Sequence, residues 1–142
     1  MSVESLNLDT ARTWSARTVS EQFKQTVEKF GEKIALRTMT SQVDPLTNQI
    51  KASAEYTWKD YDRSARSFAK SLIAHKVKRT DAVTIQGSNS APWMFANVGT
   101  ILAGGVTAGV YATNKSDLCE HVVANCDAKV IVVEDEQQLQ KY

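Results

Sequence analysis

The chain is 142 residues long, which is enough for one ordinary domain and too short for two comfortable ones. Its composition, 42% hydrophobic and 23% charged, is that of a soluble globular protein, and no apolar stretch approaches the roughly 18 to 20 residues that a membrane span needs. A formal net charge of +1 argues against a general affinity for nucleic acid or anionic membranes, either of which requires an excess or a stripe of basic residues.

The amino terminus carries no recognisable targeting signal. Residues 1–10 are polar, without the apolar segment or the early basic cluster of a signal peptide. We therefore expect a cytoplasmic protein, and the sequence leaves peripheral contact with a membrane open. Residues 1–18 are predicted to form an N-terminal arm, because their apolar residues are isolated.

The first predicted helix covers residues 20–29. Thr18 or Ser20 can cap its start, and apolar side chains recur there on one helical face. Gly31 is expected to end the helix, as a glycine after the last turn commonly does.

A hairpin with a long loop is predicted next. Residues 34–39 and 54–58 have the composition of two strands, and residues 40–53 between them are polar. Asp44-Pro45 and Thr47-Asn48 are turn signals inside that segment.

A strongly amphipathic helix is predicted over residues 59–75. Its apolar stripe consists of Tyr61, Ala65, Phe68, Ala69, Leu72 and Ile73. The basic run at residues 75–79 suits the negative end of a helix dipole. A solvated helix end is sufficient to explain this run, and a site for phosphate or lipid is the alternative.

The second half of the chain predicts a parallel sheet with helical crossovers. Strands and helices alternate as β-α-β-α-β, over residues 81–86, 90–105, 106–111, 116–125 and 129–133. The run Val130-Ile131-Val132-Val133 is continuously apolar, as a strand covered on both faces should be. Residues 134–141 would begin another helix. The predicted class is therefore α/β, with an N-terminal helix and hairpin before the parallel-sheet segment.

The two cysteines do not predict a disulfide or a metal site. Cys119 and Cys126 lie seven residues apart on one predicted helix, so their Cα atoms are about 10 Å apart. A disulfide needs roughly 7 Å or less. His121 lies about 200° around that helix from Cys119, which argues against shared metal ligation. Both cysteines are better explained by packing.

The turn Gly87-Ser88-Asn89-Ser90, between a strand and a helix, could hold an anion on its backbone N–H groups. It lacks the Gly-Lys-Ser/Thr of a Walker loop and the last glycine of a nucleophile elbow. Ser90 as a helix cap, with Pro92 in the first turn, explains it sufficiently. We find no convincing general-acid/base pair and assign no catalytic residue; Glu134-Asp135-Glu136 is read as the acidic first turn of the last helix.

The best binding candidates are Tyr111, Thr113 and Asn114. They follow a predicted parallel strand directly, at the edge where open α/β sheets place their ligands. The alternative is structural: Thr113, Asn114 or Ser116 would cap the next helix.

Several segments resemble the N-terminal part of acyl-CoA synthetases, in particular the long-chain, bubblegum-type branch of these adenylate-forming, AMP-binding enzymes. The segments are Asn89-Ser90-Ala91-Pro92-Trp93, Ile101-Leu102-Ala103-Gly104-Gly105, Gly109-Val110-Tyr111-Ala112-Thr113-Asn114 and Asn125-Cys126-Asp127-Ala128-Lys129-Val130-Ile131-Val132-Val133. The resemblance covers residues 19–142. It implies that a long-chain fatty acid reacts with ATP, assisted by magnesium, to an acyl-adenylate, and that the acyl group then passes to CoA.

The resemblance also implies a place for the loop after residue 110. In these synthetases the matching loop lies near the route of the CoA thiol arm, so a contact from Thr113 or Asn114 to that arm is expected. The family's phosphate loop, its aromatic-Thr-Glu segment, its ribose-binding aspartate and its C-terminal lysine are absent from residues 1–142. We therefore expect an incomplete large domain over residues 19–142 that holds no cofactor itself, while ATP, CoA and Mg belong to the full enzyme.

Two functions remain open from the sequence. In the first, the chain belongs to a long-chain acyl-CoA ligase and is inactive alone. In the second, it is a remnant that serves as a structural or interaction subunit, with a protein partner or a second copy covering its open sheet edge. A small nucleotide-binding module is a weaker third reading, because no phosphate loop is present.

Overall fold

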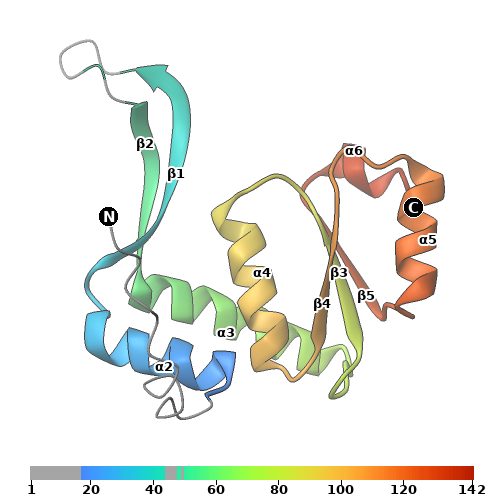
Figure 1. The fold of residues 1–142 in the computed structure, drawn as a ribbon, viewed down its shortest axis with the longest axis horizontal. Coiled ribbons are helices and arrows are strands. Elements are labelled where there is room, and N and C mark those ends of the chain that lie inside the picture. Colours follow the sequence, from blue (N-terminus) through green and yellow to red (C-terminus); the bar gives the residue numbers. More distant parts are fainter. Residues whose placement is uncertain (1–16, 44–47, 49) are drawn as a thin grey trace, which may run out of the picture.

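The computed structural model describes residues 17–43, 48 and 50–142 (Figure 1). The predicted arm up to residue 16, and the turn signals at Asp44-Pro45 and Thr47, lie outside the described residues. The elements are α2 (Val19–Phe30), β1 (Ile34–Val43), β2 (Ile50–Thr57), α3 (Trp58–Ala74), β3 (Ala82–Gln86), α4 (Ala91–Leu102), β4 (Val106–Val110), α5 (Ser116–Asn125), β5 (Val130–Val133) and α6 (Glu136–Leu139). The predicted α/β class and the order of the elements are confirmed.

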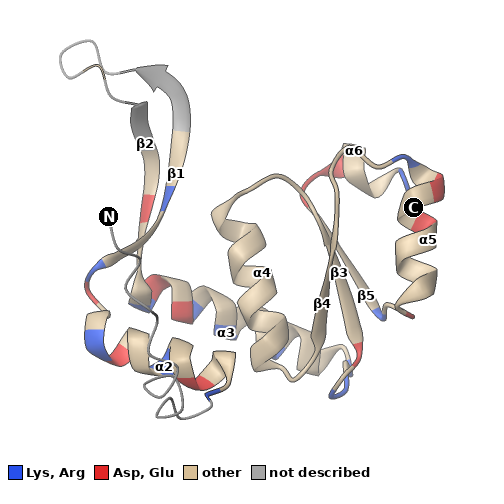
Figure 2. Cartoon of the chain, in the orientation of Figure 1, with Lys and Arg blue, Asp and Glu red and all other residues tan. Residues whose placement is uncertain are grey.

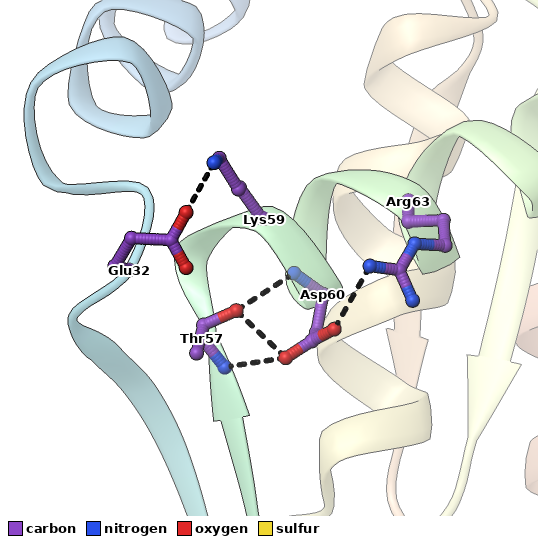
Figure 3. Close-up of polar contacts among 5 residues, drawn as sticks. All are labelled: Glu32, Thr57, Lys59, Asp60 and Arg63. Atoms are coloured by element: carbon purple, nitrogen blue, oxygen red, sulfur yellow. Dashed lines mark hydrogen bonds and ion pairs between the residues drawn. The ribbon is translucent and has the colours of Figure 1, made fainter.

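Capping boxes fix the starts of α2 and α3. Thr18 accepts a hydrogen bond from the backbone N–H of Glu21 at 3.2 Å, and the Glu21 carboxylate accepts one from the Thr18 N–H at 2.8 Å. Thr57 and Asp60 repeat this exchange at 3.0 and 3.1 Å (Figure 3). Thr18 is thus one of the two caps predicted, whereas α3 begins one residue earlier than expected.

Ion pairs surround the start of α3. Lys59 pairs with Glu32 from the α2–β1 connection, and Arg63 Nη2 lies 3.2 Å from Asp60 Oδ1 (Figure 3). Both pairs are largely exposed, so each contributes little to stability by itself. The Lys59 pair nevertheless joins α3 to the segment that leads from α2 into the hairpin.

Gly31 ends α2 as predicted, but for a different reason. Its φ of −46° is an ordinary right-handed value, so no left-handed turn requires glycine here. A Cβ at this position would lie 2.9 Å from the Val27 carbonyl oxygen and 3.0 Å from Lys59 Cε. Glycine here avoids a clash with the Val27 carbonyl of α2 itself, and the flexible Lys59 side chain of α3 lies over the same position.

The hairpin is longer than predicted. Its strands pair from Ile34↔Thr57 out to Met39↔Ala52 and Val43↔Ile50, so most of the expected loop over residues 40–53 is strand. Figure 1 shows this two-stranded ribbon extending from the helices α2 and α3 away from the rest of the described chain. The loop prediction for residues 40–53 was wrong because it rested on polar composition, whereas the pairing of two strands depends on backbone hydrogen bonds that polar residues also form.

The parallel sheet has the order β4-β3-β5, which makes β3 its central strand. Figure 1 shows α4 on one side of this sheet and α5 on the other. All five residues of β3 are buried. The expectation that Val130–Val133 is covered on both faces is wrong, because β5 is an edge strand and Ile131 is 36% exposed. Position in the strand order decides burial here, not the apolar run itself.

Helices α3 and α4 contact both hydrophobic cores. One core contains Phe23, Tyr61, Ala65 and Val98, and the other contains Leu72, Val77, Val83, Ile85 and Ala96. The predicted stripe on α3 is confirmed except for Ile73, which is 58% exposed. Ile73 lies about 100° around the helix from the buried Leu72.

Close packing of the two helices depends on Gly99 of α4. A Cβ at Gly99 would lie 2.5 Å from the Ala65 carbonyl oxygen and 2.9 Å from Phe68 Cδ1. Real Cβ atoms do not approach a backbone oxygen so closely, and the interior of a protein cannot absorb the difference cheaply. Any side chain at this position must push α3 and α4 apart.

We predict that Gly99→Ala lowers the free energy of unfolding by about 1–3 kcal/mol, the usual range for overpacking, even though alanine favours helix. Urea unfolding followed by circular dichroism measures it. Gly109→Ala is the matched control, because a Cβ there meets only Trp93 Cζ2 at 3.9 Å. A Gly99→Ala protein as stable as the unsubstituted chain would contradict the close approach.

We predict that Asp60→Asn reduces the loss of stability in acid. Hydrogen bonds from the Thr57 side chain and backbone lower the pKa of Asp60 from its ordinary 3.8, and Arg63 adds to the shift. Because the folded pKa is the lower one, the carboxylate stabilises the fold above the unfolded pKa and loses this effect as the pH falls through the folded pKa.

Urea midpoints at neutral pH and at several acidic values test this. The Asp60→Asn chain should be less stable at neutral pH, and the difference should shrink as the pH falls below about 4. Asp117→Asn is the control, since Asp117 lies in the first turn of α5, where no side chain caps the helix. A constant difference between the Asp60→Asn chain and the unsubstituted chain at every pH would contradict the prediction.

Candidate functional site

A small cavity opens at the carboxyl edge of the parallel sheet. Its volume is about 190 Å³, and it lies where β3 and β5 end. It is lined by Ile85, Gln86, Gly87, Ser90, Pro92, Trp93, Val132, Val133 and Glu134. Chain connections leave β3 and β5 toward opposite faces of the sheet, into α4 and α6, and open α/β sheets place ligands at such a point.

The turn beside this cavity already binds a carboxylate of the same chain. Ser88 N–H donates to Glu134 Oε2 at 2.8 Å, and the Ser88 hydroxyl donates to Oε1. Glu134 therefore does not belong to the first turn of the last helix, as the sequence suggested; that helix begins at Glu136, after Asp135 as its cap. Ser90 caps α4 as predicted, accepting from Trp93 N–H at 3.3 Å.

Glycine is needed at position 87 for this contact. A Cβ there would lie 3.0 Å from Glu134 Cβ, so a side chain would push the carboxylate away from the turn. The sequence left anion binding by residues 87–90 open beside the capping role of Ser90, and in the structure Ser88 holds the carboxylate of Glu134. No free phosphate position remains on Ser88 N–H.

Gln86 joins the cavity to the loop after β4. Its side chain is 1% exposed; Nε2 donates to the Tyr111 carbonyl at 2.9 Å and to Cys119 Sγ at 3.3 Å. Its Oε1 accepts from the Tyr142 hydroxyl at 2.8 Å. Sequence reasoning missed this residue, although a long polar side chain at the end of a buried strand was the available signal.

The loop that holds the predicted binding residues is fixed mainly through backbone atoms. Asn114 N–H donates to the Tyr111 carbonyl at 3.0 Å, and Lys141 Nζ donates to the Ala112 carbonyl at 2.7 Å. Tyr111 is 80% exposed, Thr113 is exposed and Asn114 is half-buried. Thr113 and Asn114 side chains make no hydrogen bond to any residue that the structure describes, so both are available to a ligand.

None of the three predicted caps is used by α5. Its N-cap is Lys115, which makes no side-chain hydrogen bond to the helix. The structural alternative for Thr113, Asn114 and Ser116 is therefore wrong. The backbone contacts of the preceding turn position this helix instead.

Tyr142 is held in its neutral form. Burial raises the pKa of its hydroxyl to about 12, and the neighbouring Cys119 adds to the shift. The shift extends to higher pH the range in which the hydroxyl keeps its proton and can donate to Gln86. Both cysteines are free thiols, Cys119 buried and Cys126 partly buried.

The arrangement supports binding more readily than catalysis. The one carboxylate at the cavity, Glu134, is engaged by Ser88. Within the described part of the chain, no group of three His, Cys, Asp or Glu residues could hold a metal ion. The side chains of Thr113 and Asn114 are the polar groups at this edge that bond to no described residue. No helix among the described residues is long and apolar enough to cross a membrane.

Comparison with known proteins agrees with this fold. The family model described as AMP-binding enzyme matches residues 23–142. A long-chain-fatty-acid–CoA ligase of Xenopus laevis, ACSBG2, is 38% identical over 124 residues, which are 87% of this chain and 16% of the relative. The chain thus spans about a sixth of that relative's length.

Solved structures show the same architecture at low sequence identity. The anthranilate–CoA ligase AuaEII, solved with anthranoyl-AMP, has a TM-score of 0.75 and 18% identity, covering 92% of this chain and 23% of its own. The fatty acid AMP ligase of Legionella pneumophila has a TM-score of 0.72 and 16% identity, covering 97% and 22%. At these identities the likeness shows the fold alone.

We predict that Glu134→Ala exposes the Ser88 amide. Loss of a hydrogen bond to a charged acceptor should speed hydrogen exchange of that amide by about tenfold or more. Exchange followed by NMR measures this at single residues. Glu120→Ala, which removes an exposed glutamate of α5, is the control and should leave Ser88 unchanged. Unchanged exchange in Glu134→Ala would show that the contact does not persist in solution.

Proposed function

The chain belongs to the AMP-binding enzyme family, and we propose that it takes part in the activation of long-chain fatty acids to acyl-CoA. The observation that carries the proposal is the 38% identity, over 87% of this chain, to a long-chain-fatty-acid–CoA ligase. In this reaction the fatty acid carboxylate attacks ATP to form an acyl-adenylate and release pyrophosphate, and the thiol of CoA then attacks the acyl carbon, which forms the thioester and releases AMP.

Residues 19–142 act in this proposal as a supporting part of the large domain. No group of three acidic, His or Cys side chains among the described residues could hold a metal ion, and the turn between β3 and α4 is occupied by Glu134. Adenylate formation is therefore assigned to groups other than those described. By themselves, residues 1–142 are expected to catalyse no turnover.

The binding contribution of this chain lies in the loop after β4. Thr113 and Asn114 stand at the carboxyl edge of the sheet, with side chains that bond to no described residue. A hydroxyl and a carboxamide can accept or donate hydrogen bonds to the amide groups of the CoA thiol arm. Gln86 and Lys141 hold the loop through its carbonyl groups, which leaves these two side chains free.

CoA titration of the isotope-labelled 142-residue chain tests the proposal. We expect shifts of the Thr113 and Asn114 amide resonances, weakened at least severalfold in Asn114→Ala. Asn125→Ala, which removes an exposed asparagine at the end of α5, should bind as the unsubstituted chain does. With ATP, palmitate and CoA present, the chain should release no pyrophosphate.

The two readouts separate the parts of the proposal. Shifts confined to other elements, or equal weakening by Asn114→Ala and Asn125→Ala, would reject the CoA contact. Clear pyrophosphate release would show that these residues carry catalytic groups and would reject the supporting role.

A further inference from the structure

The opposite edge of the sheet, where the parallel strands begin, carries a local excess of positive charge. The connection from α3 to β3 contains Lys76, Lys78 and Arg79, and Lys129 precedes β5 at the same edge. All four residues are exposed. Figure 2 shows these basic positions on the turn between α3 and β3 and at the start of β5.

Backbone contacts hold the basic connection in one conformation. Lys76 N–H donates to the Ile73 carbonyl at 2.9 Å, and Thr80 N–H donates to the Gly104 carbonyl at 2.8 Å. Lys76 and Thr80 both have left-handed backbone angles, with φ of 62° and 70°. Asp81 accepts from Lys78 N–H at 2.8 Å. The backbone of this connection is thus an ordered turn, which fixes the positions from which its basic side chains extend.

Three of the four cations have no carboxylate partner in the described part of the chain. Lys129 pairs with Asp127 at 2.6 Å, whereas Lys76, Lys78 and Arg79 form no ion pair with any described residue. If carboxylates of the described chain neutralised these cations, ion pairs like that of Lys129 would be present. These side chains are therefore free to meet negative charge from outside.

Exposed apolar side chains flank the same cations. Ile73, at the end of α3, is 58% exposed, and Val106, at the start of β4, is 52% exposed. Val106 N–H donates to the Asp81 carbonyl at 2.9 Å, which places it directly beside the basic connection. Apolar residues among unpaired lysine and arginine are the composition of surfaces that lie in a lipid headgroup layer.

A compact phosphate ligand fits this edge less well than an extended surface does. The hollow there, about 330 Å³, is lined by Asp81 together with His75, Lys76, Val77, Lys78 and Lys129. A single phosphate in the hollow would lie against the Asp81 carboxylate. A broad negative surface would instead meet the exposed cations and cover Ile73 and Val106.

We propose that Ile73, Lys76, Lys78, Arg79, Val106 and Lys129 form a surface that docks on anionic lipid bilayers. The net charge of +1 gives the chain no general affinity for anionic membranes, so the proposed docking depends on the exposed cations gathered at this edge of the sheet. Docking needs no turnover, so the proposal stands or falls separately from fatty acid activation.

Vesicle co-sedimentation of the 142-residue chain tests the proposal. Vesicles of phosphatidylcholine with about 30% phosphatidylserine should bind it, whereas pure phosphatidylcholine vesicles should not, and salt of about 0.5 M should release it. The triple variant Lys76→Gln, Lys78→Gln, Arg79→Gln should bind on the order of 100-fold more weakly. Ile73→Ser should weaken binding severalfold while leaving its salt dependence in place.

A matched triple variant controls for total charge. Lys24→Gln, Lys29→Gln, Lys33→Gln removes three exposed cations near α2 and should bind as the unsubstituted chain does. Circular dichroism of each variant establishes that it is folded. Equal loss in both triple variants, equal binding to both kinds of vesicle, or full competition by millimolar inorganic phosphate would overturn the proposal.

Discussion

The fold depends on the approach of α3 to α4 at Gly99, where no side chain separates α4 from the Ala65 carbonyl. Both hydrophobic cores are built against these two helices, so their spacing decides whether either core can close. On one side the aromatic rings of Phe23, Trp58 and Tyr61 pack with centroids 5.0 to 6.1 Å apart. On the other side α4 covers the central strand β3. A larger distance between α3 and α4 would weaken the packing of each core. It would also weaken the contact between the N-terminal section and the sheet.

The two edges of the parallel sheet differ in how their polar groups are satisfied. At the carboxyl edge Gln86, Ser88, Glu134 and Tyr142 bond to groups of the same chain. At the opposite edge three cations meet no described carboxylate. Internal pairing fixes the geometry of one edge, whereas unpaired charge leaves the other open to an external partner.

Sequence reasoning located the elements well where side-chain period and caps agree. Thr18 and Ser90 cap the helices as expected, and α5 has its predicted bounds, because local hydrogen bonds and the helical period carry that information. The reasoning failed where neighbours distant in the chain decide the outcome. Burial of β3 rather than β5 follows from strand order, which no single strand encodes.

The candidate site was predicted only in part for the same reason. The edge after β4 was identifiable from the position of Tyr111, but the bonds of Gln86 to that loop connect residues far apart in the chain. Glu134 was wrongly assigned to the first turn of the last helix, because an acidic residue anywhere near the start of a helix is favourable to its dipole. The basic run at residues 75–79 was visible in the sequence, but the position of Lys129 at the same edge follows from the pairing of β5 with β3, which the sequence does not show.

The contact between Glu134 and Ser88 has a consequence for any anion that approaches the carboxyl edge. The carboxylate belongs to the residue that directly follows β5, so its effective concentration at the turn is on the order of millimolar or higher. A free anion of the same intrinsic affinity displaces it only above that concentration. An anion can therefore bind at this turn in two cases. It makes additional contacts that outweigh those of Glu134, or the end of β5 moves away and takes Glu134 with it.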